Sequence, residues 1–339
     1  MEDEIKNLIK IWIKAISCLC YCYYVSSRIP KGIFRLLSLL PIIFVFLLLP
    51  LTVHSFHLCG STTLFLVWLC LFRLLLFAFD QGPLSPLPPN ILHFILISSL
   101  PAKIKPNNLP HYYSEKRFSK LILFLKLLLL AAIVRAYDYR DKLHPHFILL
   151  LYRCHLCLDL ELALALCAAP ARVFGFQIEP QFSEPYISTS LQDFWSRRWN
   201  RVVSSILRLT VYDPIRRIST CVLGQHYSPI LARLVTFAVS GLMHELIYYY
   251  LARVPPTWEV TWFFVLHGMS TAVEVEVKKT AGRRGWRLHR VVSGLLTLLF
   301  LAATGEWLFF PQLIRNGVDS KAIKEYSIMV DFVKPKLLL

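Results

Sequence analysis

The sequence predicts an all-α, polytopic integral membrane protein with about eight transmembrane helices. Of its 339 residues, 56% are hydrophobic and only 17% are charged, a balance that excludes a disordered chain and is unusual for a soluble enzyme. The mean hydropathy is +0.53. Long apolar runs recur along the chain, and basic residues gather between them. We therefore expect one membrane-embedded domain over residues 1–339.

Each expected span is a run long enough to cross the hydrocarbon core, which takes about 20 mostly apolar residues. Two further runs depart from this pattern, because 121–134 is short and 8–25 is interrupted by Lys10 and Lys14. Residues 91–100 are too few to cross and are typical of a re-entrant or interfacial segment. The clearest spans are 36–53, 61–79, 147–169, 230–251, 258–277 and 291–310.

The basic residues predict which loops face the cytoplasm. Residues 172–217 carry the densest basic set, whereas residues 54–60 contain no Lys or Arg. Loops rich and poor in basic residues alternate along most of the chain, with residues 135–146 as a mild exception, as the positive-inside rule requires. We therefore expect residues 170–229 to form a cytoplasmic loop and residues 230–310 to form the last spans.

The basic excess, 37 Lys and Arg against 21 Asp and Glu, would suggest a nucleic-acid partner in a soluble protein. No zinc-finger, RNP or leucine-zipper pattern accompanies it, so we expect no nucleic-acid partner. We expect no metal site either, since the CxxC string of Cys154 and Cys157 lacks a second pair.

Within the cytoplasmic loop, we expect an amphipathic helix that lies at the membrane interface. Ser190, with Asp193 three residues later, forms a capping box that predicts a helix start at about Leu191. Asn200 falls at the edge between an apolar and a basic face. The apolar face comprises Leu191, Trp195, Trp199, Val202, Ile206 and Leu209, and the opposite face comprises Arg197, Arg201, Ser204 and Arg208.

His244 lies near the middle of the apolar run 230–251. A charged side chain at that depth costs roughly 2.5 to 3.5 kcal/mol, so ionisable residues there usually line a cavity or a pathway. Burial disfavours the charged imidazole, and we expect a neutral ring that accepts a proton. Ser240, four residues earlier, shares its helical face and is a candidate to orient the ring. Glu245 points about 100° away and cannot simply bond to the ring.

Two strings carry a family resemblance: Phe194-Trp195-Ser196-Arg197-Arg198-Trp199-Asn200 and Ser240-Gly241-Leu242-Met243-His244-Glu245. Together they resemble the membrane-bound O-acyltransferase superfamily. Residues 179–200 and 36–79 more closely resemble the plant wax synthases, which are long-chain-alcohol O-fatty-acyltransferases, and the likeness extends over nearly the whole chain. Ser196 departs from the glycine expected there, but neither proposed catalytic group is lost.

The resemblance implies an enzyme of the endoplasmic reticulum membrane that transfers a fatty acyl group from acyl-coenzyme A to the hydroxyl of a long-chain fatty alcohol, forming a wax ester. His244 would be the catalytic base that takes the hydroxyl proton as the oxygen attacks the thioester carbonyl. Asn200 would be its partner, hydrogen-bonding the carbonyl or its oxyanion, or positioning the acyl donor. The reaction needs no metal, and no cofactor beyond acyl-coenzyme A as cosubstrate.

We expect the neighbouring aromatic and basic residues to form a platform for acyl-coenzyme A, because guanidinium groups bind phosphate bidentately. Anchoring of the same arginines to lipid headgroups is an equal alternative. The platform comprises Trp195, Arg197, Arg198, Trp199 and Arg201.

Other interpretations remain open at this stage. A sterol is an alternative acceptor. His155 and Asp159 form an HxxxD string, which we interpret as a structural i, i+4 pair rather than a catalytic one. A proton-coupled transporter is a second alternative, although no internal repeat is visible. The sequence makes no prediction of oligomeric state. The intramembrane ionisable residues that a transporter would use are Arg153, Asp159, Glu161, His244, Glu245 and His267.

Overall fold

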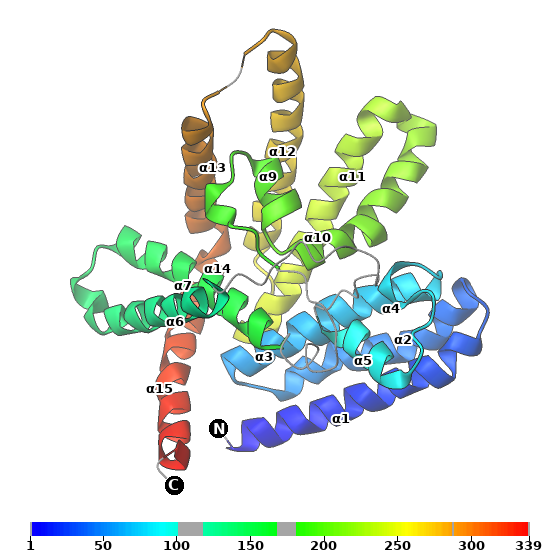
Figure 1. Cartoon of the computed structure of the whole chain (residues 1–339), viewed down its shortest axis with the longest axis horizontal. Helices are drawn as coiled ribbons and strands as arrows, with labels where there is room; N and C mark the ends of the chain where they lie inside the picture. Colours follow the sequence, from blue (N-terminus) through cyan, green and yellow to red (C-terminus); the bar gives the residue numbers. More distant parts are fainter. Residues whose placement is uncertain (1, 101–117, 168–180, 287, 338–339) are drawn as a thin grey trace. The chain divides into compact units, whose positions relative to one another are not determined.

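The chain is helical throughout its described part. A computed structural model describes residues 2–100, 118–167, 181–286 and 288–337, and no strand occurs in these ranges (Figure 1). The all-α prediction is confirmed.

Two compact units are present. Unit 1 comprises Met1–Pro101 and Pro180–Val318, and unit 2 comprises Ala102–Glu179 and Asp319–Leu339. That the chain is a single membrane-embedded domain stays a prediction.

Among the described residues, five helices are long and apolar enough to span a membrane. The expected runs 121–134, 147–169 and 258–277 also form helices where they are described, but they fall outside this set. Charged residues within the last two of these helices lower their hydropathy. The count of about eight spans is therefore not confirmed. The five candidate spans are Glu2–Arg28, Ile33–Thr52, Phe56–Ala78, Arg201–Ala252 and Arg290–Arg315.

The span Phe56–Ala78 is mostly enclosed by other parts of unit 1. Its middle is a π-helical segment, and beyond that segment it carries Arg73, which is only 2% exposed. Arg73 donates to three carbonyls at the end of the short helix expected at 91–100, where helical carbonyls otherwise lack partners. The helices here are α1 (Glu2–Tyr24), α2 (Ile33–Leu48), α3 (Phe56–Thr62), the π-helical η3 (Thr63–Cys70), α4 (Leu71–Ala78) and α5 (Ile91–Ser99).

Residues 191–212 do not form the continuous amphipathic helix that the sequence predicted. The N-cap half of the predicted capping box is present, because the Ser190 hydroxyl accepts from the Asp193 backbone N–H at 2.9 Å. The Asp193 carboxylate accepts from the backbone N–H of Thr189 at 3.4 Å and not from that of Ser190. The helix then ends, since Trp199 is extended and Asn200 is left-handed with φ 37°. No single apolar face therefore runs from residue 191 to residue 209. The pieces are α9 (Leu191–Asp193), η7 (Phe194–Arg198), α10 (Arg201–Leu207) and η8 (Arg208–Tyr212).

Helix α11 (Asp213–Ala252) begins well before the expected start of the span at residue 230, so the predicted loop 170–229 is partly helical. The helix is broken at Gly224, whose φ of 74° and ψ of 175° are not helical. Figure 1 shows two arms that fold back on each other at this bend. The Thr220 hydroxyl donates to the Ser228 hydroxyl across it at 2.9 Å. Glycine permits the bend because it has no Cβ.

Unit 1 continues with α12 (Glu259–Arg283) and a final helical run that contains a π-helical turn. Unit 2 contains two consecutive helices, α6 and α7, joined by the short 3-10 segment η5. It also contains most of the last helix, α15, which the sequence did not predict. These elements are α13 (Arg290–Thr304), η9 (Gly305–Phe309), α14 (Pro311–Arg315), α6 (Phe118–Ala136), η5 (Tyr137–Lys142), α7 (Pro145–Cys167) and α15 (Val318–Leu337).

Helices α11 and α12 cross at very short range. A Cβ added to Gly241 of α11 would lie 2.9 Å from Thr261 Cα of α12. One added to Gly268 of α12 would lie 2.9 Å from the Phe237 Cβ of α11. Both positions therefore exclude larger residues, and two glycines, one on each helix, let the backbones approach. This crossing positions the residues around His244.

We expect Gly241→Val to destabilise unit 1, because the added side chain meets backbone atoms of Thr261. Overpacking of this kind costs about 1–3 kcal/mol. The measurement is the thermal midpoint of the purified protein in detergent, read by size-exclusion chromatography after heating. Gly282→Ala is the matched control, since a Cβ at Gly282 meets nothing within 4 Å. An unchanged midpoint for Gly241→Val would contradict the close crossing.

Candidate active site

His244 lies in a cluster of aromatic rings from three separate segments. Its ring is half-buried and lies 4.2 Å, centroid to centroid, from Phe264 of α12, with the ring planes tilted by 32°. Trp68 of η3 meets it edge to face at 4.8 Å and 85°. Phe309 of η9 lies 6.0 Å away. The imidazole is therefore held between apolar surfaces that disfavour its charged form.

The orientation of the His244 ring is set by its own helix. Nδ1 lies 2.8 Å from the backbone carbonyl oxygen of Ser240. A carbonyl can only accept a hydrogen bond, so Nδ1 carries the proton and donates. The neutral ring then has its lone pair on Nε2, which is the nitrogen able to take a proton from another molecule. Position 240 orients the ring as the sequence suggested, but through its backbone carbonyl and not through the hydroxyl.

Glu245 serves the neighbouring helix rather than the His244 ring. Its Oε1 accepts from the Thr261 backbone N–H at 3.3 Å and from the Thr261 hydroxyl at 3.2 Å. Thr261 lies in the first turn of α12, where N–H groups lack partners within the helix, and no side chain of the N-cap residue Trp258 supplies one. A carboxylate at this positive helix end is favourable. Glu245 therefore caps α12 from α11.

His267 is fully engaged in holding Trp195. Its Nδ1 accepts from the Trp195 indole N–H at 3.1 Å, so its Nε2 carries the proton and donates to the Thr304 hydroxyl at 2.9 Å. Thr304 in turn donates to the Phe300 carbonyl at 2.7 Å. His267 is completely buried and both its nitrogens are occupied. It is thus a positioning residue in this arrangement and not a second base.

Trp195 connects the string at residues 194–200 with the rings around His244. Its ring lies 5.7 Å from Phe264, which also contacts His244, and 5.8 Å from Phe237 of α11. The Ser204 hydroxyl donates to the Trp195 carbonyl at 2.9 Å, which ties α10 to the preceding turn. The two parts of the sequence that carry the resemblance therefore share one aromatic cluster.

Asn200 is the N-cap of α10. Its Oδ1 accepts from the Val203 backbone N–H at 3.3 Å, and its left-handed backbone is one that asparagine tolerates better than most residues. The amide NH₂ group donates no hydrogen bond within the described part of the chain. No hydrogen bond joins Asn200 to His244 within the described part of the chain. The two segments meet instead through Trp195 and Phe264, whose rings are in contact, and Phe264 also contacts the ring of His244. The proposed partnership of Asn200 with His244 stays a prediction.

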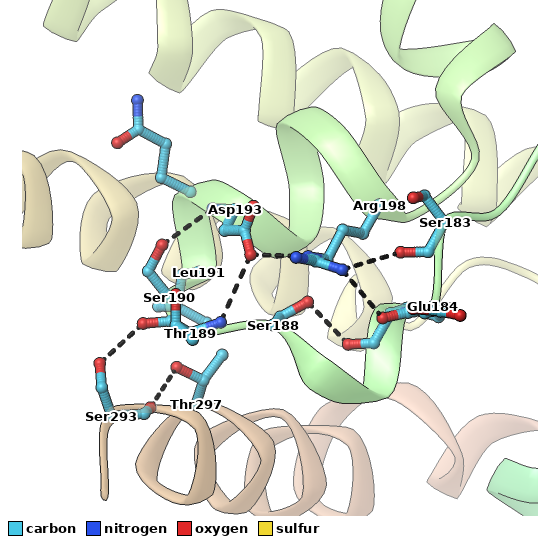
Figure 2. A network of polar contacts seen from close by, with 12 residues as sticks. Ser183, Glu184, Ser188, Thr189, Ser190, Leu191, Asp193, Arg198, Ser293 and Thr297 are labelled. Atoms are coloured by element: carbon cyan, nitrogen blue, oxygen red, sulfur yellow. Dashed lines mark hydrogen bonds and ion pairs between the residues drawn. The ribbon is translucent and has the colours of Figure 1, made fainter. Parts of the chain in front are cut away.

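The arginines of the expected platform differ in their surroundings. Arg198 is committed to its own segment: Nε donates to Asp193 at 2.7 Å, and Nη1 donates to the Ser183 carbonyl at 3.1 Å and to that of Glu184 at 3.4 Å (Figure 2). Arg197 is exposed and Arg201 is half-buried. The geometry leaves Arg197 better placed than Arg198 to meet a phosphate.

Trp199 turns its ring inward. It stacks on Phe194 at 5.4 Å with the ring planes 16° apart, and it meets Phe182 edge to face at 5.1 Å.

Asp193 also accepts from the Thr189 backbone N–H at 3.4 Å, and the Thr189 carbonyl accepts from the Ser293 hydroxyl of α13 at 2.7 Å (Figure 2). One hydrogen bond thus links this segment to α13.

The His155–Asp159 string belongs to unit 2, whereas His244 belongs to unit 1. Tyr137 donates to His155 Nδ1 at 3.1 Å, and His155 Nε2 donates to Tyr326 at 2.9 Å, which itself donates to Asp159. Burial raises the pKa of Tyr137 far above its ordinary value, so the phenol keeps its proton. These bonds tie α15 to α7 and support the structural interpretation of the HxxxD string.

Comparison with known proteins identifies the class. Residues 178–266, which include Asn200 and His244, match the membrane bound O-acyl transferase family. A long-chain-alcohol O-fatty-acyltransferase of Simmondsia chinensis is 48% identical over 100% of this chain and 98% of its own length. A probable long-chain-alcohol O-fatty-acyltransferase of Arabidopsis thaliana is 48% identical over 98% of both chains. An acyl-CoA–sterol O-acyltransferase of Arabidopsis thaliana is 42% identical over 96% of both chains.

The chain therefore belongs to the long-chain-alcohol O-fatty-acyltransferase family, the wax synthases, within the membrane-bound O-acyltransferases. It is a multi-pass integral membrane enzyme that transfers an acyl group from a donor to a hydroxyl. This membership favours the enzyme over the proton-coupled transporter.

We expect Arg198→Ala to lower the stability of the segment around residues 181–200, because it removes an ion pair and two hydrogen bonds to carbonyls. Hydrogen bonds to charged groups contribute about 1.5–3 kcal/mol each. The measurement is the rate of limited proteolysis within this segment, together with the thermal midpoint.

Arg197→Ala is the matched control for that experiment. Arg197 is exposed, so its replacement leaves both readouts near the wild type. Equal behaviour of the two variants would show that the bonds of Arg198 do not hold this segment.

Proposed function

We propose that this enzyme transfers a fatty acyl group from acyl-coenzyme A to the hydroxyl of a long-chain fatty alcohol, producing a wax ester and free coenzyme A. The names of the 48% identical relatives support the fatty alcohol as acceptor. The hydrogen bond from His244 Nδ1 to the Ser240 carbonyl supports the mechanism, because it leaves Nε2 as a proton acceptor inside an aromatic cluster. That single bond is the observation on which the proposal rests.

The proposed reaction proceeds in one displacement at the thioester. His244 Nε2 takes the hydroxyl proton while the alcohol oxygen attacks the carbonyl carbon. The tetrahedral intermediate collapses, the carbon–sulfur bond breaks, and the imidazolium returns its proton to the departing thiolate. Atoms and charge balance without an acyl-enzyme, a metal or a cofactor beyond acyl-coenzyme A.

In this proposal Asn200 supplies the donor for the oxyanion. Its NH₂ group is available while its Oδ1 caps α10, so the residue has a structural and a catalytic half. Exposed Arg197, together with half-buried Arg201 at the start of α10, would bind the phosphates of coenzyme A from the cytoplasmic side. Both long apolar substrates can reach the site laterally from the bilayer, and we propose the endoplasmic reticulum as its location on the basis of family membership.

A sterol is the second candidate acceptor. It is supported by the 42% identity with a relative named acyl-CoA–sterol O-acyltransferase, over 96% of both chains. The two acceptors share the hydroxyl on which His244 would act and differ in the shape of the apolar body.

We expect membranes from a host that lacks neutral-lipid acyltransferases to form labelled ester when this chain is expressed and given labelled acyl-coenzyme A with a fatty alcohol. The test offers a fatty alcohol, a sterol and a diacylglycerol in parallel, and the fatty alcohol gives the largest product. A larger product from the sterol would replace the proposed acceptor. If no ester forms from any of the three acceptors, the proposal that this enzyme acylates lipid alcohols is overturned.

His244→Ala removes the base, so we expect product formation in the same assay to fall by at least about 10²-fold. His226→Ala is the matched control, because His226 is an exposed histidine of α11, two residues after the bend at Gly224. Expression and the size-exclusion profile of both variants match the wild type. Retained turnover in His244→Ala would show that another group takes the proton.

Asn200→Asp separates the two roles of this residue. Aspartate caps a helix as well as asparagine does and accepts the left-handed backbone, so the thermal midpoint stays near that of the wild type. The two amide donors are lost, so we expect kcat to fall by about 10²- to 10³-fold. If Asn200→Asp keeps full turnover, the residue is a cap alone.

A further inference from the structure

Trp68 carries a buried polar group without a partner. Its side chain is 3% exposed, and among the described residues its indole N–H meets no hydrogen-bond acceptor. Buried indole N–H groups usually find a partner, because leaving one unpaired is costly. The contrast with Trp195 is direct, since the Trp195 N–H is bonded to His267 Nδ1 at 3.1 Å.

The ring that carries the unpartnered group packs against the ring of the base. The Trp68 and His244 ring centroids are 4.8 Å apart, and the ring planes are at 85°. His244 Nδ1 is already bonded to the Ser240 carbonyl, and Phe264 covers the ring at 4.2 Å. A molecule that reaches His244 Nε2 therefore enters the surroundings of Trp68.

The backbone at Trp68 is also unusual. Trp68 lies in the π-helical segment Thr63–Cys70, which has eight residues and is flanked by α-helix on both sides. A π-helical turn contains an extra residue, which rotates the side chains relative to an α-helix and often occurs at functional sites. In this segment the turn directs a tryptophan against the α11 histidine. A phenylalanine would fill the same apolar position without the orphaned donor.

We propose that the Trp68 indole N–H binds the acceptor alcohol, donating a hydrogen bond to the hydroxyl oxygen whose proton His244 Nε2 removes. This inference rests on the proposed function and names a residue that positions its acceptor. The hydroxyl oxygen has two lone pairs: one accepts from Trp68, and the other attacks the thioester carbonyl. The O–H proton passes to His244 Nε2. Trp68 exchanges no proton, so the balance of the reaction is unchanged.

The test compares an oxygen acceptor with a sulfur acceptor of the same chain length, 1-hexadecanol and 1-hexadecanethiol. A thiol sulfur accepts hydrogen bonds weakly, so the indole N–H contributes little to its binding. For Trp68→Phe we expect kcat/KM for the alcohol to fall about five- to tenfold, with KM for acyl-coenzyme A unchanged. The value for the thiol changes less than about twofold.

Trp262→Phe is the matched control. Trp262 is a 59% exposed tryptophan on α12, and its replacement leaves the alcohol-to-thiol ratio at the wild-type value. Replacement of Trp68 by benzothienylalanine, which exchanges the N–H for sulfur and keeps the shape of the ring, gives the same loss as Trp68→Phe and applies even if phenylalanine disturbs folding.

Two outcomes would overturn the assignment of Trp68 alone. One is a loss of equal size for alcohol and thiol, which indicates packing and no bond to oxygen. The other is full alcohol turnover in the benzothienylalanine protein. A wild-type enzyme that forms neither ester nor thioester from any acceptor would instead overturn the proposed function, and this inference with it.

Discussion

The site depends on the close crossing of α11 and α12. Gly241 lets the α11 backbone approach Thr261, and one turn later Glu245 caps the first turn of α12 at the same threonine. The crossing brings Phe264 against the ring of His244 at 4.2 Å. On an α-helix, residues four apart share a face, so Gly241 and Glu245 meet α12 while Ser240 and His244 share the adjacent face. One helical turn thus provides both the packing and the base.

A histidine at this depth meets two requirements without a charged partner. Its apolar surroundings keep it neutral, and a backbone carbonyl of its own helix fixes the tautomer. Many catalytic histidines rely on a carboxylate for orientation, and such a carboxylate would be expensive in hydrocarbon. In this chain the nearby carboxylate of Glu245 is used instead as a helix cap, where the partial positive charge of the helix end favours it.

Sequence reasoning predicted the features that depend on short spacing. The N-cap at Ser190, the shared face of Ser240 and His244, and the exclusion of Glu245 from the His244 ring all follow from residue spacing along a helix. Features that depend on contacts distant in the sequence could not be predicted. Arg198 binds Asp193 and two carbonyls at residues 183 and 184, which a helical wheel does not bring together. For the same reason the sequence did not predict a role for Trp68, because its neighbour His244 is far along the chain.

In the proposed mechanism, His244 Nε2 is the nitrogen that meets the acceptor hydroxyl. The most direct measurement is an experimental structure of the enzyme in a lipid nanodisc with a non-reactive acyl-coenzyme A analogue and a long-chain alcohol. We expect an alcohol oxygen about 2.6–3.2 Å from Nε2, with Nδ1 still bonded to the Ser240 carbonyl. A ring turned so that Nδ1 faces the alcohol, or a hydroxyl held at another residue, would contradict it.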